Sequence, residues 1–234
     1  MTPQAGDPGR GPEVREMFDR IAPTYDLTNR ILSMGIDTIW RKRTVRALGP
    51  LDATSLDLCA GTLEMTLELL AAGSPRVVAV DFSAEMLERG RGRLPEGAPV
   101  DVVVGDAEAL SVEGPFGAAT CGFGLRNVPD NRAALSEVLS VLRPGGRFAV
   151  LEFFRPVRAH ARAFHGLFNK LVLPNVGGLI SGDRAAYAYL AESMVAYLSR
   201  AEFEALAIEV GFELVSSDDL LPPVASLVVL RRPA

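Results

Sequence analysis

The first part of the chain carries two segments whose apolar residues recur every three or four positions. Residues 13–25 and 29–48 have this helical spacing, and a proline and a glycine interrupt it. The pattern predicts helices over 13–50 that precede the main fold and act as a lid. Residues 1–12 are rich in Gly and Pro, so we expect them to form a disordered leader.

From residue 55 onward, short β-rich runs alternate with helical ones. We expect strands at 55–59, 76–80, 100–104, 118–123, 146–153, 212–216 and 225–230. Helices are expected at 64–72, 84–94, 131–142 and 202–210. This alternation predicts an α/β fold with a Rossmann-like, doubly wound and mostly parallel sheet of seven strands. The final helix-strand-strand order predicts an antiparallel C-terminal edge.

Residues 157–198 contain no strand pattern and are rich in Phe, Leu, Ala and Tyr. We expect them to form a helical insertion that caps the substrate. With 234 residues, 48% of them hydrophobic, the chain fits a single domain over 13–234.

Charge and cysteine content narrow the classes of partner. The net charge of −5 argues against the basic patch that nucleic-acid binding needs, so we expect no nucleic-acid partner. The two cysteines, Cys59 and Cys121, have no disulfide or metal spacing. We therefore expect no metal and a reducing, cytoplasmic location. No apolar run reaches the roughly 18 residues that a membrane span needs.

The first expected strand ends in Asp57-Leu58-Cys59-Ala60-Gly61-Thr62. Small residues there let a ligand approach the backbone at the carboxyl end of a strand, where open α/β sheets bind ligands. A dinucleotide fingerprint needs three glycines, and this loop has only Gly61. Taken alone, the loop is more typical of a plain strand-to-helix turn.

Two acidic residues end the next strands. Asp81 is placed to accept hydrogen bonds from ribose hydroxyls, although an Asp before Phe82-Ser83 also suits a helix cap. Asp106 suits either an adenine amino group or a turn. Together with the first loop, these acids predict a nucleotide-cofactor site.

Longer motifs give the chain a family resemblance. It resembles the class I S-adenosylmethionine-dependent methyltransferases, and within them the family that C-methylates the quinol ring in menaquinone and ubiquinone biosynthesis. The narrowest motif is Phe123-Gly124-Leu125-Arg126-Asn127-Val128-Pro129-Asp130. Other matching segments are 17–26, Trp40-Arg41, 142–146, Leu151-Glu152-Phe153 and 187–193.

The resemblance implies S-adenosylmethionine as the methyl donor and a small aromatic quinol as the acceptor. The donor-binding residues that it implies are Tyr25, Asp57, Cys59, Ala60, Gly61, Thr62, Asp81, Phe82, Met86, Asp106, Ala107 and Gly122. The substrate-binding residues that it implies are Asn29, Arg126, Asn127 and Tyr187.

Methyl transfer from a sulfonium to carbon is an in-line displacement, which requires positioning and a nucleophilic ring carbon. We expect Arg126 and Asn127 to be catalytic by holding a phenolic oxygen of the ring, since a guanidinium stabilises a phenolate. The alternative is structural: Arg126 pairs with an acid, and Asn127 caps a turn before Pro129.

The chain departs from the family at Leu63, where a Gly or Ala is usual, and at its C-terminus. We expect Leu63 to crowd the methionine end of the donor or to push its loop outward. The departures leave two alternatives open: an enzyme acting on another phenolic or polyketide-derived aromatic metabolite, or a relative that binds the donor without methylating.

A polyprenyl quinol lies in the bilayer, so we expect peripheral contact with the inner face of the membrane. Residues 159–180 combine apolar and basic side chains that suit this contact, or they roof the substrate pocket. The sequence leaves a homodimer open.

Overall fold

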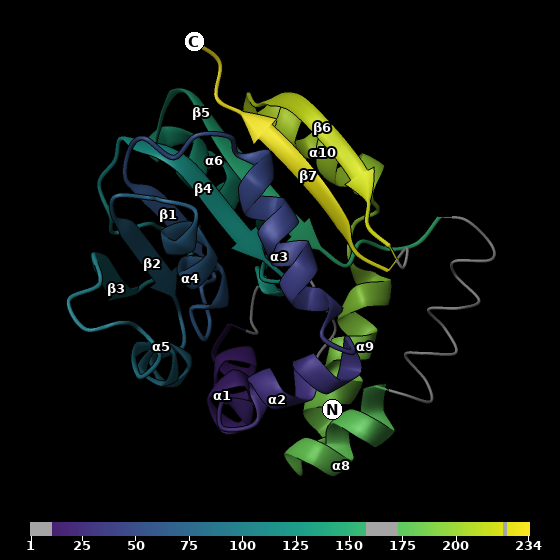
Figure 1. Ribbon diagram of the computed structural model, residues 1–234. Helices are drawn as coiled ribbons and strands as arrows, with labels where there is room; N and C mark the ends of the chain where they lie inside the picture. Colours follow the sequence, from purple (N-terminus) through teal and green to yellow (C-terminus); the bar gives the residue numbers. More distant parts are fainter. Residues whose placement is uncertain (1–10, 158–172, 222–223) are drawn as a thin grey trace.

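The computed structural model describes residues 11–157, 173–221 and 224–234, which build one seven-stranded sheet of order β3-β2-β1-β4-β5-β7-β6 (Figure 1). Strands β3, β2, β1, β4 and β5 are parallel, and β7 is antiparallel to both β5 and β6. The predicted Rossmann-like sheet with an antiparallel C-terminal edge is confirmed. The strands are β1 (Ser55–Leu58), β2 (Val77–Asp81), β3 (Val100–Val104), β4 (Phe116–Gly122), β5 (Leu142–Glu152), β6 (Glu213–Asp219) and β7 (Ser226–Arg231).

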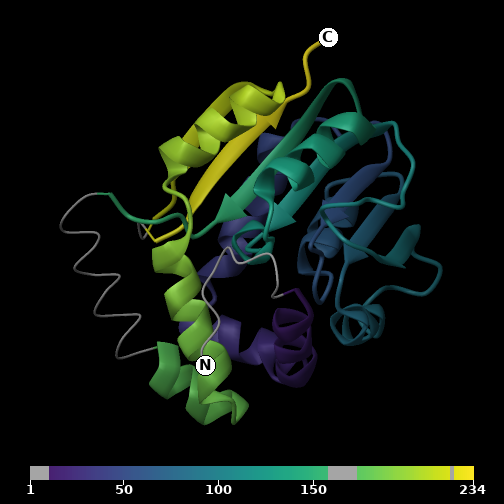
Figure 2. The same cartoon turned by 180° about the vertical axis from the view of Figure 1, so that it is seen from behind.

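Helices cover both faces of the sheet. One face packs against α3 (Ile36–Ala47) and α4 (Glu64–Ala71), and the other against α6 (Asn131–Val141) and α10 (Arg200–Val210), as Figures 1 and 2 show from opposite sides. Helix α5 (Ala84–Arg91) lies beside β2 and β3.

Strand β5 shows why both faces are apolar. Successive residues of a strand point to opposite faces. Phe148 and Val150 enter the core with α6 and α10, whereas Ala149 and Leu151 enter the core with α3 and α4. A parallel strand buried on both sides therefore reads as a continuous apolar run.

The remaining helices gather at the carboxyl ends of the parallel strands (Figure 1). They are α1 (Gly11–Ile21), α2 (Tyr25–Leu32), η2 (Leu173–Gly177), α8 (Gly178–Ser181) and α9 (Arg184–Ala196). Phe18 of α1 and Tyr189 of α9 belong to one apolar cluster, so the N-terminal lid and the insertion share a core. We call this group of helices the cap.

Boundaries in the cap differ from the prediction. The glycine expected to interrupt 29–48 does so, because Met34 and Gly35 have φ of +52° and +78° and end α2 before α3 begins. Helix α2 nevertheless begins at Tyr25, earlier than the expected start at residue 29. Gly11 and Pro12, expected in the leader, form the first turn of α1, and residues 1–10 lie outside the described residues. Residues 158–172 of the expected insertion also lie outside the described residues. Within the described part of the chain, no helix is long and apolar enough to cross a membrane.

Candidate functional site

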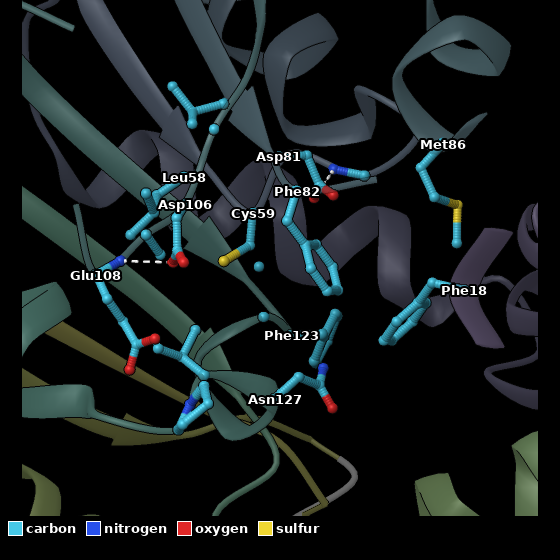
Figure 3. Close-up of a pocket in the computed structure, with 18 of the residues that line it drawn as sticks. Phe18, Leu58, Cys59, Asp81, Phe82, Met86, Asp106, Glu108, Phe123 and Asn127 are labelled. Atoms are coloured by element: carbon cyan, nitrogen blue, oxygen red, sulfur yellow. Dashed lines mark hydrogen bonds between the residues drawn. The ribbon is translucent and has the colours of Figure 1, made fainter. Parts of the chain in front are cut away.

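An opening in the described part of the chain lies where β1, β2 and β4 end. This strand-end cavity has a volume of about 290 Å³, and Figure 3 shows the side chains around it. The chain crosses from one side of the sheet to the other between β1 and β4, which is where doubly wound sheets bind ligands. The lining includes these expected residues: Tyr25, Cys59, Gly61, Asp81, Phe82, Met86, Asp106, Ala107, Gly122 and Asn127.

Asp81 both lines the strand-end cavity and holds its loop. One carboxylate oxygen accepts the Gly61 N–H at 2.8 Å, and the other accepts the Ser83 N–H at 2.9 Å. The helix cap of α5 is Ser83, whose hydroxyl accepts the Met86 N–H, so Asp81 is not the cap itself. Burial raises the pKa of Asp81 to about 6, against the opposing effect of the two backbone N–H donors.

Asp106 forms the turn that was one of its two open roles, and its position leaves the other role possible. Its carboxylate accepts the Glu108 N–H at 2.9 Å, as in a turn, and it also lines the strand-end cavity. Glu108, which the sequence analysis missed, lies beside it at the same end of the cavity, and Phe18, Phe82 and Met86 lie at the other (Figure 3).

Three expected donor residues, Asp57, Ala60 and Thr62, do not line the strand-end cavity. The fully buried Asp57 carboxylate accepts hydroxyl groups from Thr66 at 2.7 Å and Thr120 at 2.9 Å. It therefore links β1, α4 and β4, and burial raises its pKa to about 6. The Thr62 hydroxyl donates to Asp26 of α2, which fastens the cap to the β1 loop.

Leu63 does not face the donor region, so the expectation that it crowds the methionine end is wrong. It has a left-handed backbone conformation with φ of +65°, and its side chain is fully buried against Ala79 and Leu87. A Cβ atom placed on Gly90 of α5 would lie 2.4 Å from Leu63 Cγ. The chain accommodates the larger residue by keeping a glycine opposite it.

A second opening, the apolar cavity, adjoins the first and shares Tyr25 and Phe123 with it. Its volume is about 140 Å³. The other residues that line it are Asn29, Leu32, Ser33, Met34, Ile36, Asp37, Trp40, Arg41, Arg126, Phe153, Leu173, Leu190, Met194 and Val224. Tyr187 is absent from both linings, because it is buried against Gly177, where a Cβ atom would lie 2.4 Å from the ring.

Arg126 pairs with an acid, as the structural alternative predicted, and it also lines the apolar cavity. Its Nη1 lies 2.7 Å from Glu152 Oε1, and both side chains are buried. Nη1 also donates to the Phe123 carbonyl, whereas the buried Nε has no hydrogen-bond partner among the described residues. The arginine is thus held in place and still has an unused donor.

Asn127 lines the strand-end cavity and not the apolar cavity. Its side-chain oxygen accepts the Tyr189 hydroxyl at 3.5 Å, and the cap of the following helix is Asp130 rather than Asn127. The motif therefore sends Arg126 toward one cavity and Asn127 toward the other.

The sequence analysis missed an aromatic wall of the apolar cavity, of which Phe123 also lines the strand-end cavity. Phe123 and Phe153 stack with ring centroids 4.4 Å apart, and Trp40 packs on both. Phe123 has φ of +60°, a strained backbone conformation of the kind that clusters at functional sites. All three residues stand in the motifs that carried the family resemblance, so the signal was in the sequence.

The strand-end cavity fits an adenosyl ligand. Asp81 offers lone pairs for ribose hydroxyls, Asp106 offers an acceptor for an amino group, and Phe82 and Met86 supply apolar surface. A Cβ atom built on Gly61 would meet no atom within 4 Å, so the backbone there is open to close approach.

Comparison with known proteins agrees with this geometry. The model of the ubiE/COQ5 methyltransferase family matches residues 8–228. A ubiquinone/menaquinone biosynthesis C-methyltransferase UbiE from Syntrophotalea carbinolica is 41% identical, and the alignment covers 93% of each chain. A demethylmenaquinone methyltransferase from Clavibacter sepedonicus is 40% identical over 94% of this chain and 89% of its own.

Among solved structures, a SAM-dependent methyltransferase from Thermotoga maritima superposes with a TM-score of 0.67 at 18% identity. It covers 94% of this chain and 99% of its own, and at that identity it supports the fold alone. The sequence matches show the family as well as the fold, because they extend over nearly the whole chain and include the residues of both cavities. The chain belongs to the ubiE/COQ5 methyltransferase family, and it is an S-adenosylmethionine-dependent methyltransferase.

Proposed function

We propose that this enzyme transfers a methyl group from S-adenosylmethionine to a ring carbon of demethylmenaquinol or a related polyprenyl quinol. The observation that carries the proposal is the pair of adjoining cavities, one with acidic residues and one apolar, which share Tyr25 and Phe123. The names of the relatives, which include C-methyltransferases of ubiquinone and menaquinone biosynthesis, support the same substrate class.

The donor would be held by the residues of the strand-end cavity, with Asp81 on the ribose hydroxyls and Asp106 on the adenine amino group. When bound, it supplies an electrophilic methyl group. Asp19 of α1 accepts the Ser83 hydroxyl, and Asp26 of α2 accepts the Thr62 hydroxyl. These two contacts fasten the cap over the cavity and limit the access of water to the reacting atoms.

The acceptor ring would lie in the apolar cavity against Phe123 and Phe153. Arg126 would donate from its unpaired Nε to a phenolic oxygen, and Asn127 would fix the orientation of the ring at the junction. Stabilising the phenolate raises electron density on the ring carbons, which makes them better nucleophiles. The role of Glu152 is to hold the guanidinium in position.

The test is transfer of an isotopically labelled methyl group from the donor to a short-chain demethylmenaquinol kept reduced, with the product identified by mass spectrometry. We expect a labelled C-methylated product. Labelled product only with other phenols would reassign the substrate class. Donor binding in calorimetry without transfer to any aromatic acceptor would make the chain a non-methylating relative.

We further propose that the enzyme works from the cytoplasm at the inner face of the membrane. Four exposed apolar side chains support contact through the cap: Leu27 and Ile31 of α2, Met34 in the turn after α2, and Leu179 of α8. Met34 also lines the apolar cavity, so this surface is continuous with the proposed acceptor site. Most of the segment that the sequence analysis proposed for this contact, residues 159–180, lies outside the described residues.

Sedimentation with anionic vesicles tests this contact. Wild type should pellet weakly with the vesicles, and more so at low salt. Leu179→Asp should abolish pelleting, whereas Ile208→Asp, on an exposed position of α10 at the far side, should not. Protein that stays in the supernatant under every condition would contradict peripheral attachment.

A further inference from the structure

Arg41 is a second guanidinium in the apolar cavity, on α3 rather than in the Arg126 motif. It lines the cavity, and its Cζ atom lies 5.5 Å from the centre of the Phe123 ring. Its Nε is buried and has no hydrogen-bond partner among the described residues. Because buried polar groups are almost always hydrogen-bonded, an exception at a cavity wall calls for an explanation.

The charge of Arg41 is also poorly compensated. The nearest recorded carboxylate oxygen, Asp37 Oδ2, lies 3.8 Å from its Nε. Asp37 is shared, because its other oxygen accepts the Ser33 hydroxyl at 2.7 Å and lies 3.7 Å from Arg30. By contrast, Arg126 and Glu152 approach to 2.7 Å. An anionic ligand in this cavity would therefore gain more from Arg41 than from the neutral Arg126–Glu152 pair.

The two arginines contact the two members of the aromatic stack. Arg41 lies against Phe123, and Arg126 lies over Phe153 with its Cζ atom 5.6 Å from the ring centre. A flat ring packed along this wall would meet one guanidinium near each stacked ring. A 1,4-diol carries oxygens at opposite ends of its ring, one for each guanidinium.

We propose that Arg41 binds the second oxygen of the acceptor and so selects 1,4-diols over aromatic rings with a single hydroxyl. This inference rests on the proposed function, and it assigns Arg126 to one oxygen and Arg41 to the other. The hydrogen bond from a charged guanidinium to the second oxygen should make the affinity for the diol about tenfold to a hundredfold higher than that for the mono-alcohol.

A purely structural role is the competing explanation, since Arg41 and Asp37 are four residues apart on one helix and the guanidinium packs on Phe123. A structural role would change the stability of the fold and the binding of every ligand alike. It would not change the ratio of affinities for a diol and a mono-alcohol that enter the same cavity.

The experiment measures that ratio by calorimetry, with naphthalene-1,4-diol and 1-naphthol as ligands, under reducing conditions and with S-adenosylhomocysteine present. Wild type should prefer the diol by about tenfold or more. Arg41→Met should bring the two affinities within about threefold of each other, because the hydrogen bonds that it removes from the ligand are those to the second oxygen, which only the diol has. Arg43→Met is the matched control on the same helix, since Arg43 is half exposed and its recorded ion pair is with the exposed Asp218.

Arg41→Lys supplies a second variant if Arg41→Met does not fold. An ammonium lacks the planar fork of a guanidinium, so the lysine variant should keep an intermediate preference for the diol. An unchanged ratio in either folded variant would overturn the inference, and so would a wild type without any preference. The proposed function fails on a different result, which is the absence of labelled methyl transfer by wild type to a prenylated quinol.

Discussion

Replacing Arg126 tests the buried ion pair and the chemistry of the acceptor site together. Arg126→Ala would leave the Glu152 carboxylate fully buried without its cation. Breaking a buried pair from one side costs about 3–5 kcal/mol. The carboxylate keeps the Phe153 N–H at 2.7 Å, so we expect the lower end, about 3 kcal/mol. In a chain of this size each kcal/mol lowers Tm by about 2–4 °C, which gives a decrease of about 6–12 °C.

The double variant Arg126→Met with Glu152→Gln removes both charges and keeps the volume of both side chains. Replacing a whole buried pair is often neutral, so it should recover at least half of the lost stability. Urea unfolding at neutral pH with an unchanged m-value would measure this. If the double variant is as unstable as Arg126→Ala, the ion pair does not explain the stability loss.

Turnover should not recover with stability. Both variants lack the guanidinium, so each should lose about a hundredfold or more in turnover while donor affinity in calorimetry changes little. Arg126→Lys should retain part of the activity, because an ammonium can donate but lacks the fork. Restored turnover in the double variant would refute a catalytic role for Arg126 and leave only its ion pair with Glu152.

Three further predictions concern the donor loop. Donor affinity should be constant above neutral pH and weaken as the pH falls through about 6, because the ribose hydroxyls would need the ionised Asp81. Calorimetry should show this in wild type, and in Asp57→Asn at a somewhat lower pH, because that change removes a like charge that raises the pKa of Asp81. Asp81→Asn should show a weaker, pH-independent affinity. Leu63→Gly should lower the free energy of unfolding in urea by about 2–4 kcal/mol, because the loss of a buried side chain outweighs the relief of the positive φ. Donor affinity should not change, and a large loss of affinity would place Leu63 at the ligand. Gly90→Ala should destabilise the fold by about 1–3 kcal/mol, because its methyl group would clash with Leu63 and the Thr62 backbone. Adding Leu63→Ala should relieve part of this clash, so the double variant should lose less stability than the sum of the two single variants. Additive losses would contradict a direct contact.

Much of the fold could be predicted from the sequence because element type depends on local periodicity. Strands with continuous apolar runs alternate with amphipathic helices, and this alone indicates a doubly wound parallel sheet. The carboxyl ends of parallel strands meet at one edge, so Asp81 and Asp106 could be placed near a common cavity before any contact was known. The 123–130 motif follows β4 at the same edge, and the prediction that it binds the acceptor came from the family resemblance.

Which side chains of those loops reach a cavity was decided by the tertiary structure. Within the single loop after β1, Gly61 lines the strand-end cavity, Thr62 turns to Asp26, and Leu63 turns into the core. Side-chain direction in a loop follows from backbone dihedrals such as the φ of +65° at Leu63, which no periodicity encodes.

The electrostatics of the site likewise depend on residues far apart in the sequence. Glu152 is 26 residues from Arg126, yet it neutralises that arginine. Asp37 is only four residues from Arg41 and leaves it poorly compensated, because Ser33 and Arg30 also engage that carboxylate. The sequence determined which chemical groups gather at the strand ends, whereas packing determined which of them keep an unused donor or charge, because pairing depends on distances that only the folded chain sets.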